Sequence, residues 1–143
     1  MIIMTVIDGT DLVLGRMASL VSKRLLANER IDLINVEKVI IIGDPVGIFE
    51  KYKVRLTLNQ KGDPEIGPKF PKMPDRIVKR AVQGMLPMKS SRGKTALKYF
   101  KAHVGKPAEF EGKNIEKLEK AGKHLERSYE RIGNLSKKLG AKW

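Results

Sequence analysis

The chain has 143 residues, the length of one compact domain, and 41% of them are hydrophobic, an ordinary value for a globular protein. Its charge is unusual, because 29 Lys and Arg stand against 16 Asp and Glu and give a formal net charge of +13. Such a surplus attracts polyanions, so nucleic acid is the expected partner and an anionic membrane surface is the weaker alternative. The lack of cysteine excludes a disulfide framework, thiolate catalysis and Cys-based zinc sites.

The first residues predict a strand followed by a helix. Residues 2–7 are apolar and β-branched, lead into an Asp8-Gly9 turn and lack the basic flank of a signal peptide. Between residues 14 and 28, apolar residues recur at helical spacing in one stripe made of Leu14, Met17, Ala18, Val21 and Leu25. The longest apolar runs fall far short of the roughly 20 residues that span a bilayer, so we expect a soluble protein and no membrane partner.

Residues 31–36 and 39–42 predict two further stretches of buried strand. Only Glu37-Lys38 separates them, which is too short for a parallel crossover, so they form either a tight hairpin or one kinked strand. Asp44 then predicts a helix N-cap, with Pro45 as the first helical residue and an end near Val54.

Residues 56–71 contain several glycines and prolines, which predict a long surface loop. A second proline start, Pro74-Asp75, predicts a helix that ends near Gly84. Beyond it, a loop to Gly93, a short helix over 95–98 and a strand over 99–104 are expected.

The C-terminal part mixes acidic and basic residues from Lys106 onward. Ile115, Leu118 and Leu125 indicate a loosely amphipathic segment, and a last short helix is predicted over 134–139. We therefore expect a single α/β domain over residues 1–143, with an α/β core over 1–105 and a mixed-charge extension over 106–143 packed on or beside it. The expected architecture is three-layered, with a central mostly parallel sheet flanked by helices and with long basic loops.

The positive charge is concentrated in residues 68–106, which hold eleven Lys and Arg against one acid, Asp75. That difference of ten accounts for most of the net +13 of the whole chain. In the helix after Pro74, helical spacing places four polar residues on one face, namely Arg76, Lys79, Arg80 and Gln83. Charges of nearly one sign on a helix face repel one another, so contact with a polyanion is the favoured interpretation of this face.

The motifs typical of enzymes are incomplete. Arg92-Gly93-Lys94-Thr95 ends like a phosphate-binding Walker loop, but Met88 stands where the first glycine is required. The alternative is a tight basic turn whose glycine lets backbone N–H groups approach a phosphate. His103, His124, Glu109 and Glu111 lack the spacing of metal ligands or of a catalytic set. Phe70 and Tyr99 can stack on bases, although a core role is favoured for each. We therefore expect no enzyme activity, no cofactor, no metal and no small-molecule substrate.

Four segments carry a resemblance, in the order DLVLGRMAS, INVEKVIIIGDP, AVQGMLPMKSSRGK and LKYFKAHVG. Together they resemble the L-thirteen family of large-subunit ribosomal proteins over residues 4–107, in the form found in archaeal members, and GMLP in its basic context is the most specific piece. The resemblance implies an α/β fold around a parallel sheet, binding to 23S rRNA beside neighbouring large-subunit proteins, a role in early subunit assembly and a cytoplasmic, ribosomal location.

The resemblance and the basic region together give a set of expected RNA-binding residues. They are Arg16, Lys69, Lys72, Arg76, Lys79, Arg80, Lys89, Arg92, Lys94 and Lys98. In GMLP, we expect Gly84 to end its helix with a positive φ, and Met85 and Leu86 to anchor the turn to the core. Two alternatives stay open: a nucleotide-using or RNA-processing enzyme on a Rossmann-like scaffold, and a free RNA-binding regulator of translation.

Overall fold

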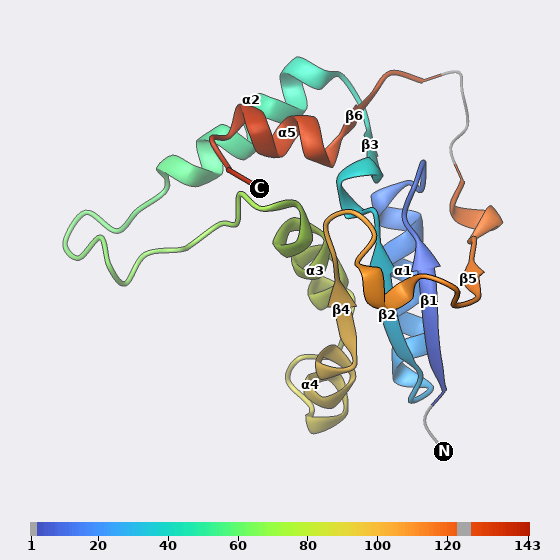
Figure 1. Cartoon of the computed structure of the whole chain (residues 1–143). Coiled ribbons are helices and arrows are strands. Elements are labelled where there is room, and N and C mark those ends of the chain that lie inside the picture. Colours follow the sequence, from blue (N-terminus) through green and yellow to red (C-terminus); the bar gives the residue numbers. More distant parts are fainter. Residues whose placement is uncertain (1–2, 123–126) are drawn as a thin grey trace.

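The computed structural model describes residues 3–122 and 127–143 and is built around a four-stranded sheet (Figure 1). Every pair of neighbouring strands in this sheet is parallel. The strand order is β4 (Phe100–Ala102), β2 (Arg30–Ile34), β1 (Met4–Asp8) and β5 (Ile115–Glu116). The predicted mostly parallel α/β sheet is confirmed.

A separate two-stranded sheet pairs β3 (Ile40–Ile42) with β6 (Tyr129–Arg131) in antiparallel register. The expected hairpin or kinked strand over 31–42 is therefore wrong, because β2 and β3 belong to different sheets. Asn35 takes a left-handed φ of 55° after β2, and a 3-10 helix, η1 (Val36–Lys38), follows it. The Asn35 side-chain amide donates to Asp8 Oδ1 at 3.0 Å, which holds this turn against the end of β1.

The part of the chain that the structure describes contains five α-helices, each at or near its predicted position. They are α1 (Leu14–Leu26), α2 (Pro45–Thr57), α3 (Pro74–Gly84), α4 (Ser91–Lys98) and α5 (Ile132–Lys138). Asp44 and Pro45 occupy the predicted N-cap and first position of α2, although the Asp44 side chain makes no capping hydrogen bond. α4 begins earlier than predicted because the Ser90 side chain caps it, accepting from the Gly93 backbone N–H at 3.3 Å.

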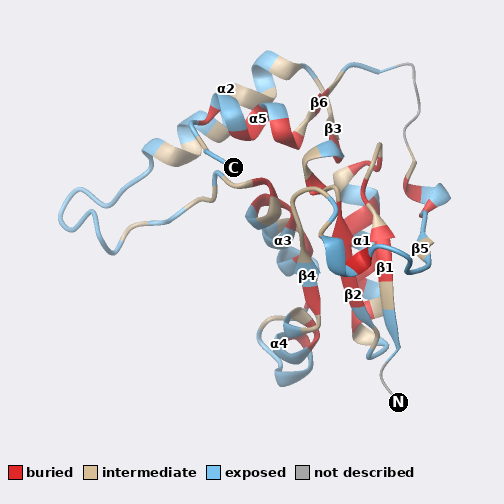
Figure 2. Ribbon diagram, in the orientation of Figure 1, coloured by how far each residue is buried: buried red, intermediate tan, exposed pale blue. Residues whose placement is uncertain are grey.

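The core lies between the sheet and the helices on one of its faces (Figure 2). Ile7 and Leu33 of the sheet are fully buried against Met17 and Val21 of α1 and Val78 of α3. On the other face, a smaller cluster forms around Phe110 of the 3-10 helix η2 (Ala108–Phe110), with Val6 and Ile34. The second covering layer is therefore a short 3-10 segment instead of a long helix.

Residues beyond 106 take part in both sheets. β5 extends the main sheet, and α5 packs Ile132 and Leu135 into fully buried positions. Ile115 lies in β5 and Leu118 just before the 3-10 helix η3 (Glu119–Ala121), so the expected amphipathic segment is instead strand and turn. Leu125 and His124 fall outside the described residues.

α2 and the loop after it project from this core (Figures 1 and 2). None of the 13 residues of α2, all of them described, is buried. Residues 58–66 are exposed throughout, as predicted for a surface loop. Among residues 3–122 and 127–143, no helix is long and apolar enough to cross a membrane.

Candidate RNA interface

α3 presents a basic face to solvent because its apolar residues dock it onto the core. Ile77, Val78 and Val82 are buried. The opposite face is exposed along its length and consists of Arg76, Lys79, Arg80 and Gln83. Pro74 starts the helix at its first position, where the missing N–H removes no helical hydrogen bond. The predicted division of this helix into an apolar and a basic face is confirmed.

The basic face of α3 forms one wall of a shallow groove, and the end of the 58–73 loop forms the other wall. This α3 groove has a volume of about 330 Å³ and is lined by Lys69, Phe70, Pro71, Arg76, Lys79, Arg80 and Gln83. It brings four of the ten expected RNA-binding residues into one place. None of the described residues that line it is acidic, so the positive charge of the groove is not offset within it.

Arg80 fixes the loop to the helix in addition to carrying charge. Its Nη1 donates to the Lys69 carbonyl oxygen at 3.0 Å, and its guanidinium lies 4.4 Å from the centroid of the Phe70 ring. The guanidinium of Arg55, from α2, lies 5.8 Å from the centroid of the same ring. Phe70 therefore contacts two arginines at the edge of the α3 groove, and does not lie in the core as favoured from the sequence.

The basic segment around Gly93 is the first turn of α4 and not a tight loop. Gly93 packs so closely against Pro87 that a Cβ would lie 2.2 Å from the Pro87 carbonyl oxygen. The glycine is thus required for backbone packing, which corrects the expectation that it opens the backbone to a phosphate. Arg92 Nη2 donates to the Leu26 carbonyl oxygen at 3.0 Å and ties α4 to the end of α1. Lys89 and Lys94 are exposed nearby in the chain.

The GMLP segment differs from its expected geometry in two respects. Gly84 is the last residue of α3, has no positive φ, and is followed by Met85 in the right-handed region. Leu86 is 6% exposed and anchors the turn, as expected, but Met85 is 46% exposed and does not. The helix therefore ends by an ordinary turn before Pro87, without the left-handed glycine that the sequence suggested.

The remaining expected residues are not gathered in the α3 groove. Arg16 is exposed in the first turn of α1, and Lys72 is exposed just before α3, where its carbonyl oxygen accepts from Ser136 Oγ at 2.7 Å. Lys98 lines a small pocket of about 80 Å³ together with Arg30 and Lys101. These residues give a wider basic surface without a shared cavity.

Two residues of α2 next to the α3 groove were missed by the sequence analysis. Tyr52 and Arg55 line a second cavity of about 260 Å³ that also includes Phe70, Pro71 and Arg80. The Arg55 guanidinium lies 5.2 Å from the centroid of the Tyr52 ring. Their spacing of three residues on one helix places a Tyr and an Arg on the same face, which could have indicated a binding surface. Nothing in the sequence indicated that α2 lies beside α3.

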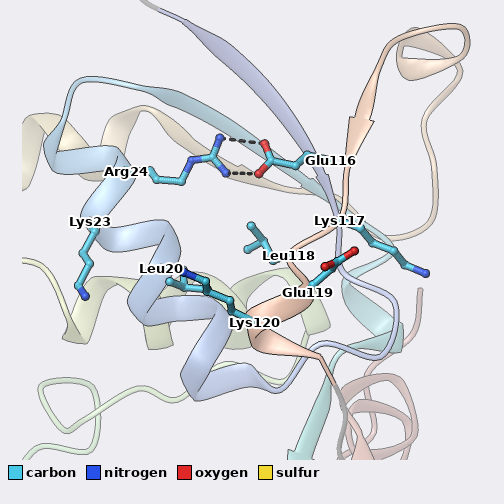
Figure 3. A pocket seen from close by; sticks show the side chains of 8 residues that line it. All are labelled: Leu20, Lys23, Arg24, Glu116, Lys117, Leu118, Glu119 and Lys120. Carbon is cyan, nitrogen blue, oxygen red and sulfur yellow. Dashed lines mark hydrogen bonds and ion pairs between the residues drawn. The ribbon is translucent and has the colours of Figure 1, made fainter.

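A larger groove of about 580 Å³ runs between α1 and the segment after β5 (Figure 3). Leu20 and Leu118 lie in it, and Lys23 and Lys120 flank it. Arg24 crosses one end, where its two terminal nitrogens each donate to Glu116 at 2.9 Å. This groove carries both signs of charge, unlike the α3 groove.

Arg24 also pairs with Glu29, and this pair affects the titration of both groups. Its Nη2 donates to Glu29 Oε1 at 2.6 Å and its Nε to Oε2 at 2.8 Å. The hydrogen bonds from Arg24 lower the pKa of Glu29, and Thr5 Oγ1 adds a further donor. The same bonds raise the pKa of Arg24. The network joins α1 to the start of β2 and, through Glu116, to β5.

The histidine that the structure describes has a structural role. His103 Nε2 lies 3.0 Å from Oδ1 of the buried Asp32, and its ring packs 5.1 Å from the Phe110 ring. Glu109 and Glu111 are both exposed. Within the described part of the chain, no three His, Asp or Glu side chains come together as metal ligands.

Comparison with known proteins gives the family. The sequence model of the family described as ribosomal protein L13 matches residues 3–109. The chain is 47% identical to large ribosomal subunit protein uL13 of Methanosphaera stadtmanae, over 97% of this chain and 99% of that protein. It is 42% identical to uL13 of Methanococcoides burtonii, over 98% and 100%, and 47% identical to uL13 of Archaeoglobus fulgidus, over 82% and 73%. The chain belongs to the ribosomal protein L13 family.

Family membership settles the class of protein. Members of the uL13 family are structural components of the ribosome, so the chain is a ribosomal protein and not an enzyme, and its place is on the ribosome in the cytoplasm. The resemblance seen in DLVLGRMAS and the three later segments is confirmed, as is its archaeal character. The matched residues include the whole of α3 and α4 and the end of the 58–73 loop, and so every residue that lines the α3 groove.

Proposed function

We propose that this uL13-family protein binds 23S rRNA directly as a structural constituent of the large subunit, and that it supports early assembly of that subunit. The α3 groove carries the proposal, because Lys69, Arg76, Lys79 and Arg80 line it with no acidic side chain among its described lining residues. Like charges at helical spacing repel each other, and a phosphate backbone removes that repulsion while releasing its condensed counterions.

The dimensions of the basic face suit a phosphate backbone. Arg76 and Gln83 are seven residues apart on α3, a rise of roughly 10 Å at about 1.5 Å per residue, which is enough to meet two or so adjacent phosphates. Contacts to phosphates fix the position and orientation of the protein on the RNA without distinguishing one base sequence from another. The protein therefore supplies charge and shape to the RNA, as a scaffold component does.

We extend the interface beyond the α3 groove to the other exposed cations expected from the sequence. They are Arg16, Lys72, Lys89, Arg92, Lys94 and Lys98. In this proposal residues 1–143 act as one rRNA-binding domain, in which the chain beyond residue 105 is part of the packed unit. Support comes from β5 in the main sheet and from Ser136 of α5, whose hydroxyl donates to the Lys72 carbonyl oxygen.

Neighbouring large-subunit proteins are the second class of partner that we propose. The groove in Figure 3 is less one-sided in charge than the α3 groove, because Glu116 and Glu119 line it together with four Lys and Arg. Both signs of charge beside apolar side chains suit a protein partner. The groove's apolar lining, with Leu20 and Leu118, offers surface that a protein side chain can cover.

The test reverses two charges of the α3 groove that make no hydrogen bond or ion pair with any described residue, in the variant Arg76→Glu with Lys79→Glu. We expect the affinity for a 23S rRNA transcript to fall about tenfold or more in filter binding at fixed salt. If about six phosphates are neutralised, log K of the wild type falls with log[salt] at a slope of roughly −4 to −5. The variant's slope should be shallower by about two.

The matched control is Lys23→Glu with Lys120→Glu, which makes the same change in net charge at the groove between α1 and β5. It should leave most of the affinity and the slope intact. Equal losses in both double variants would mean that net charge, and not the α3 groove, governs binding. An affinity of the wild type that does not depend on salt would contradict the proposed function itself.

A further inference from the structure

The cavity between α2 and α3 adjoins the α3 groove. It has a volume of about 260 Å³, and Phe70, Pro71 and Arg80 line both spaces. Its remaining walls include Tyr52 and Arg55 of α2 and Gly84 at the end of α3. A chain of phosphates lying on the α3 groove would therefore pass beside the mouth of this cavity.

The walls of the cavity combine two aromatic rings and two arginine side chains with the apolar side chains of Pro71, Ile77 and Ala81. Two guanidiniums lie near the Phe70 ring, with Arg80 at 4.4 Å and Arg55 at 5.8 Å from its centroid. Unpaired RNA bases stack on aromatic rings and on the planes of arginine side chains. None of the described residues that line the cavity is acidic, so nothing there repels the phosphate attached to such a base.

The size and polarity of the cavity narrow the class of ligand. A volume of about 260 Å³ lies just below the roughly 300–1,000 Å³ of sites for drug-sized ligands, so a single planar ring system suits it better than a larger molecule. The phenol of Tyr52 is a polar group in the wall. A tyrosine hydroxyl is protonated at neutral pH, and burial raises the pKa of Tyr52 further. The hydroxyl can therefore donate to a ring nitrogen or carbonyl oxygen of a base.

We propose that this cavity receives one unpaired nucleobase of the RNA whose phosphates lie on the α3 groove. The proposal rests on the proposed function, and it adds a specific base contact to an interface otherwise made of backbone contacts. It also gives α2 a role, because the helix has no buried residue of its own and its Tyr52 and Arg55 would close over the base.

Gly84 allows the cavity to be filled without removing any existing contact. A Cβ added at Gly84 meets no atom within 4 Å, and its φ is not in the left-handed region. The variant Gly84→Leu should therefore fold and place its side chain where the base would lie. The control is Gly62→Leu in the exposed loop, where an added Cβ also meets nothing within 4 Å.

Binding to the 23S rRNA transcript should fall about tenfold in Gly84→Leu, in the range expected for loss of one base–aromatic stack. The salt slope should equal that of the wild type, because no cation is altered. Dimethyl sulfate and hydroxyl-acylation probing of the bound RNA should show one unpaired nucleotide that the wild type and Gly62→Leu protect and Gly84→Leu does not. Phe70→Leu should give the same loss of protection if Gly84→Leu fails to fold.

Wild-type affinity and an unchanged reactivity pattern in both Gly84→Leu and Phe70→Leu would overturn the base-binding cavity while leaving the proposed function intact. A weaker complex with a shallower salt slope would also overturn it, because the loss would then come from phosphate contacts. Failure of the wild type to bind the transcript at all would overturn the proposed function, and this inference with it.

Discussion

Gly93 is the position at which adding one methyl group should do most damage to the fold. A Cβ there would lie 2.2 Å from the Pro87 carbonyl oxygen and 2.5 Å from the carbonyl carbon. Carbon and oxygen in contact ordinarily stand about 3.3 Å apart, so the two backbones must separate by roughly 1 Å. Neither can move freely, because the Pro87 carbonyl accepts from the Ser90 N–H at 3.0 Å and Ser90 caps the helix that contains Gly93.

The expected net effect of Gly93→Ala is a loss of roughly 1–2 kcal/mol in the free energy of unfolding. Overpacking of a tight contact costs about 1–3 kcal/mol. Alanine recovers up to about 1 kcal/mol through its better helix propensity, so the two effects partly offset each other. Movement of α4 would also strain the 3.0 Å hydrogen bond from Arg92 to the Leu26 carbonyl oxygen.

Urea unfolding at equilibrium measures this effect, and the chain offers a matched control. Gly47 occupies the same third position in α2 that Gly93 occupies in α4, but its nearest neighbour to an added Cβ is Asp44 Oδ2 at 3.8 Å. Gly47→Ala should therefore keep or raise the stability by up to about 1 kcal/mol. If Gly93→Ala were as stable as the wild type, the close packing against Pro87 would not be what requires glycine there.

Two further predictions concern the ion-pair network and the segment that resembles a Walker loop. Because hydrogen bonds from Arg24 lower the pKa of Glu29 below 4.5, its carboxylate contributes stability above about pH 4.5, and this contribution is lost as the pH falls through the lower folded pKa. Glu29→Gln should therefore be less stable than the wild type at pH 7 and approach it near pH 3 in urea unfolding, and a gap that stays constant with pH would contradict the role of this pair. The protein should show no tight binding of Mg-ATP by isothermal titration, because the Gly93 N–H already donates to Ser90 Oγ and the Lys94 N–H to the Ser90 carbonyl oxygen. A dissociation constant in the low micromolar range, abolished by Lys94→Ala, would show that this helix start accepts a triphosphate.

The sequence predicted those parts of the fold that local pattern determines. α3 was located from Pro74 and from the helical spacing of its apolar residues, and its basic face follows directly from that spacing. α1 was located in the same way from a stripe that includes Met17 and Val21. The parallel sheet followed from the alternation of strands and helices, since parallel strands need crossovers.

The features that escaped prediction depend on contacts between segments far apart in the chain. β2 and β3 were placed together because they adjoin in sequence, but β3 pairs with β6, almost ninety residues later. Gly93 was explained by phosphate binding because its contact with the Pro87 backbone has no signature in composition or periodicity. The cavity between α2 and α3 likewise needs the end of the 58–73 loop to fold back onto both helices.

Two of the arginines expected to bind RNA already bind within the protein, and this does not disqualify them. A guanidinium has five N–H donors, so Arg80 can give one to the Lys69 carbonyl oxygen and keep others for a phosphate. The internal bond also fixes the side chain before RNA arrives, which lowers the rotamer entropy lost on binding. Lysine would keep the charge at position 80 but lose the flat face that lies over Phe70. Arg80 therefore has two roles, because it holds the 58–73 loop against α3 and it also contributes charge to the surface that is proposed to bind RNA.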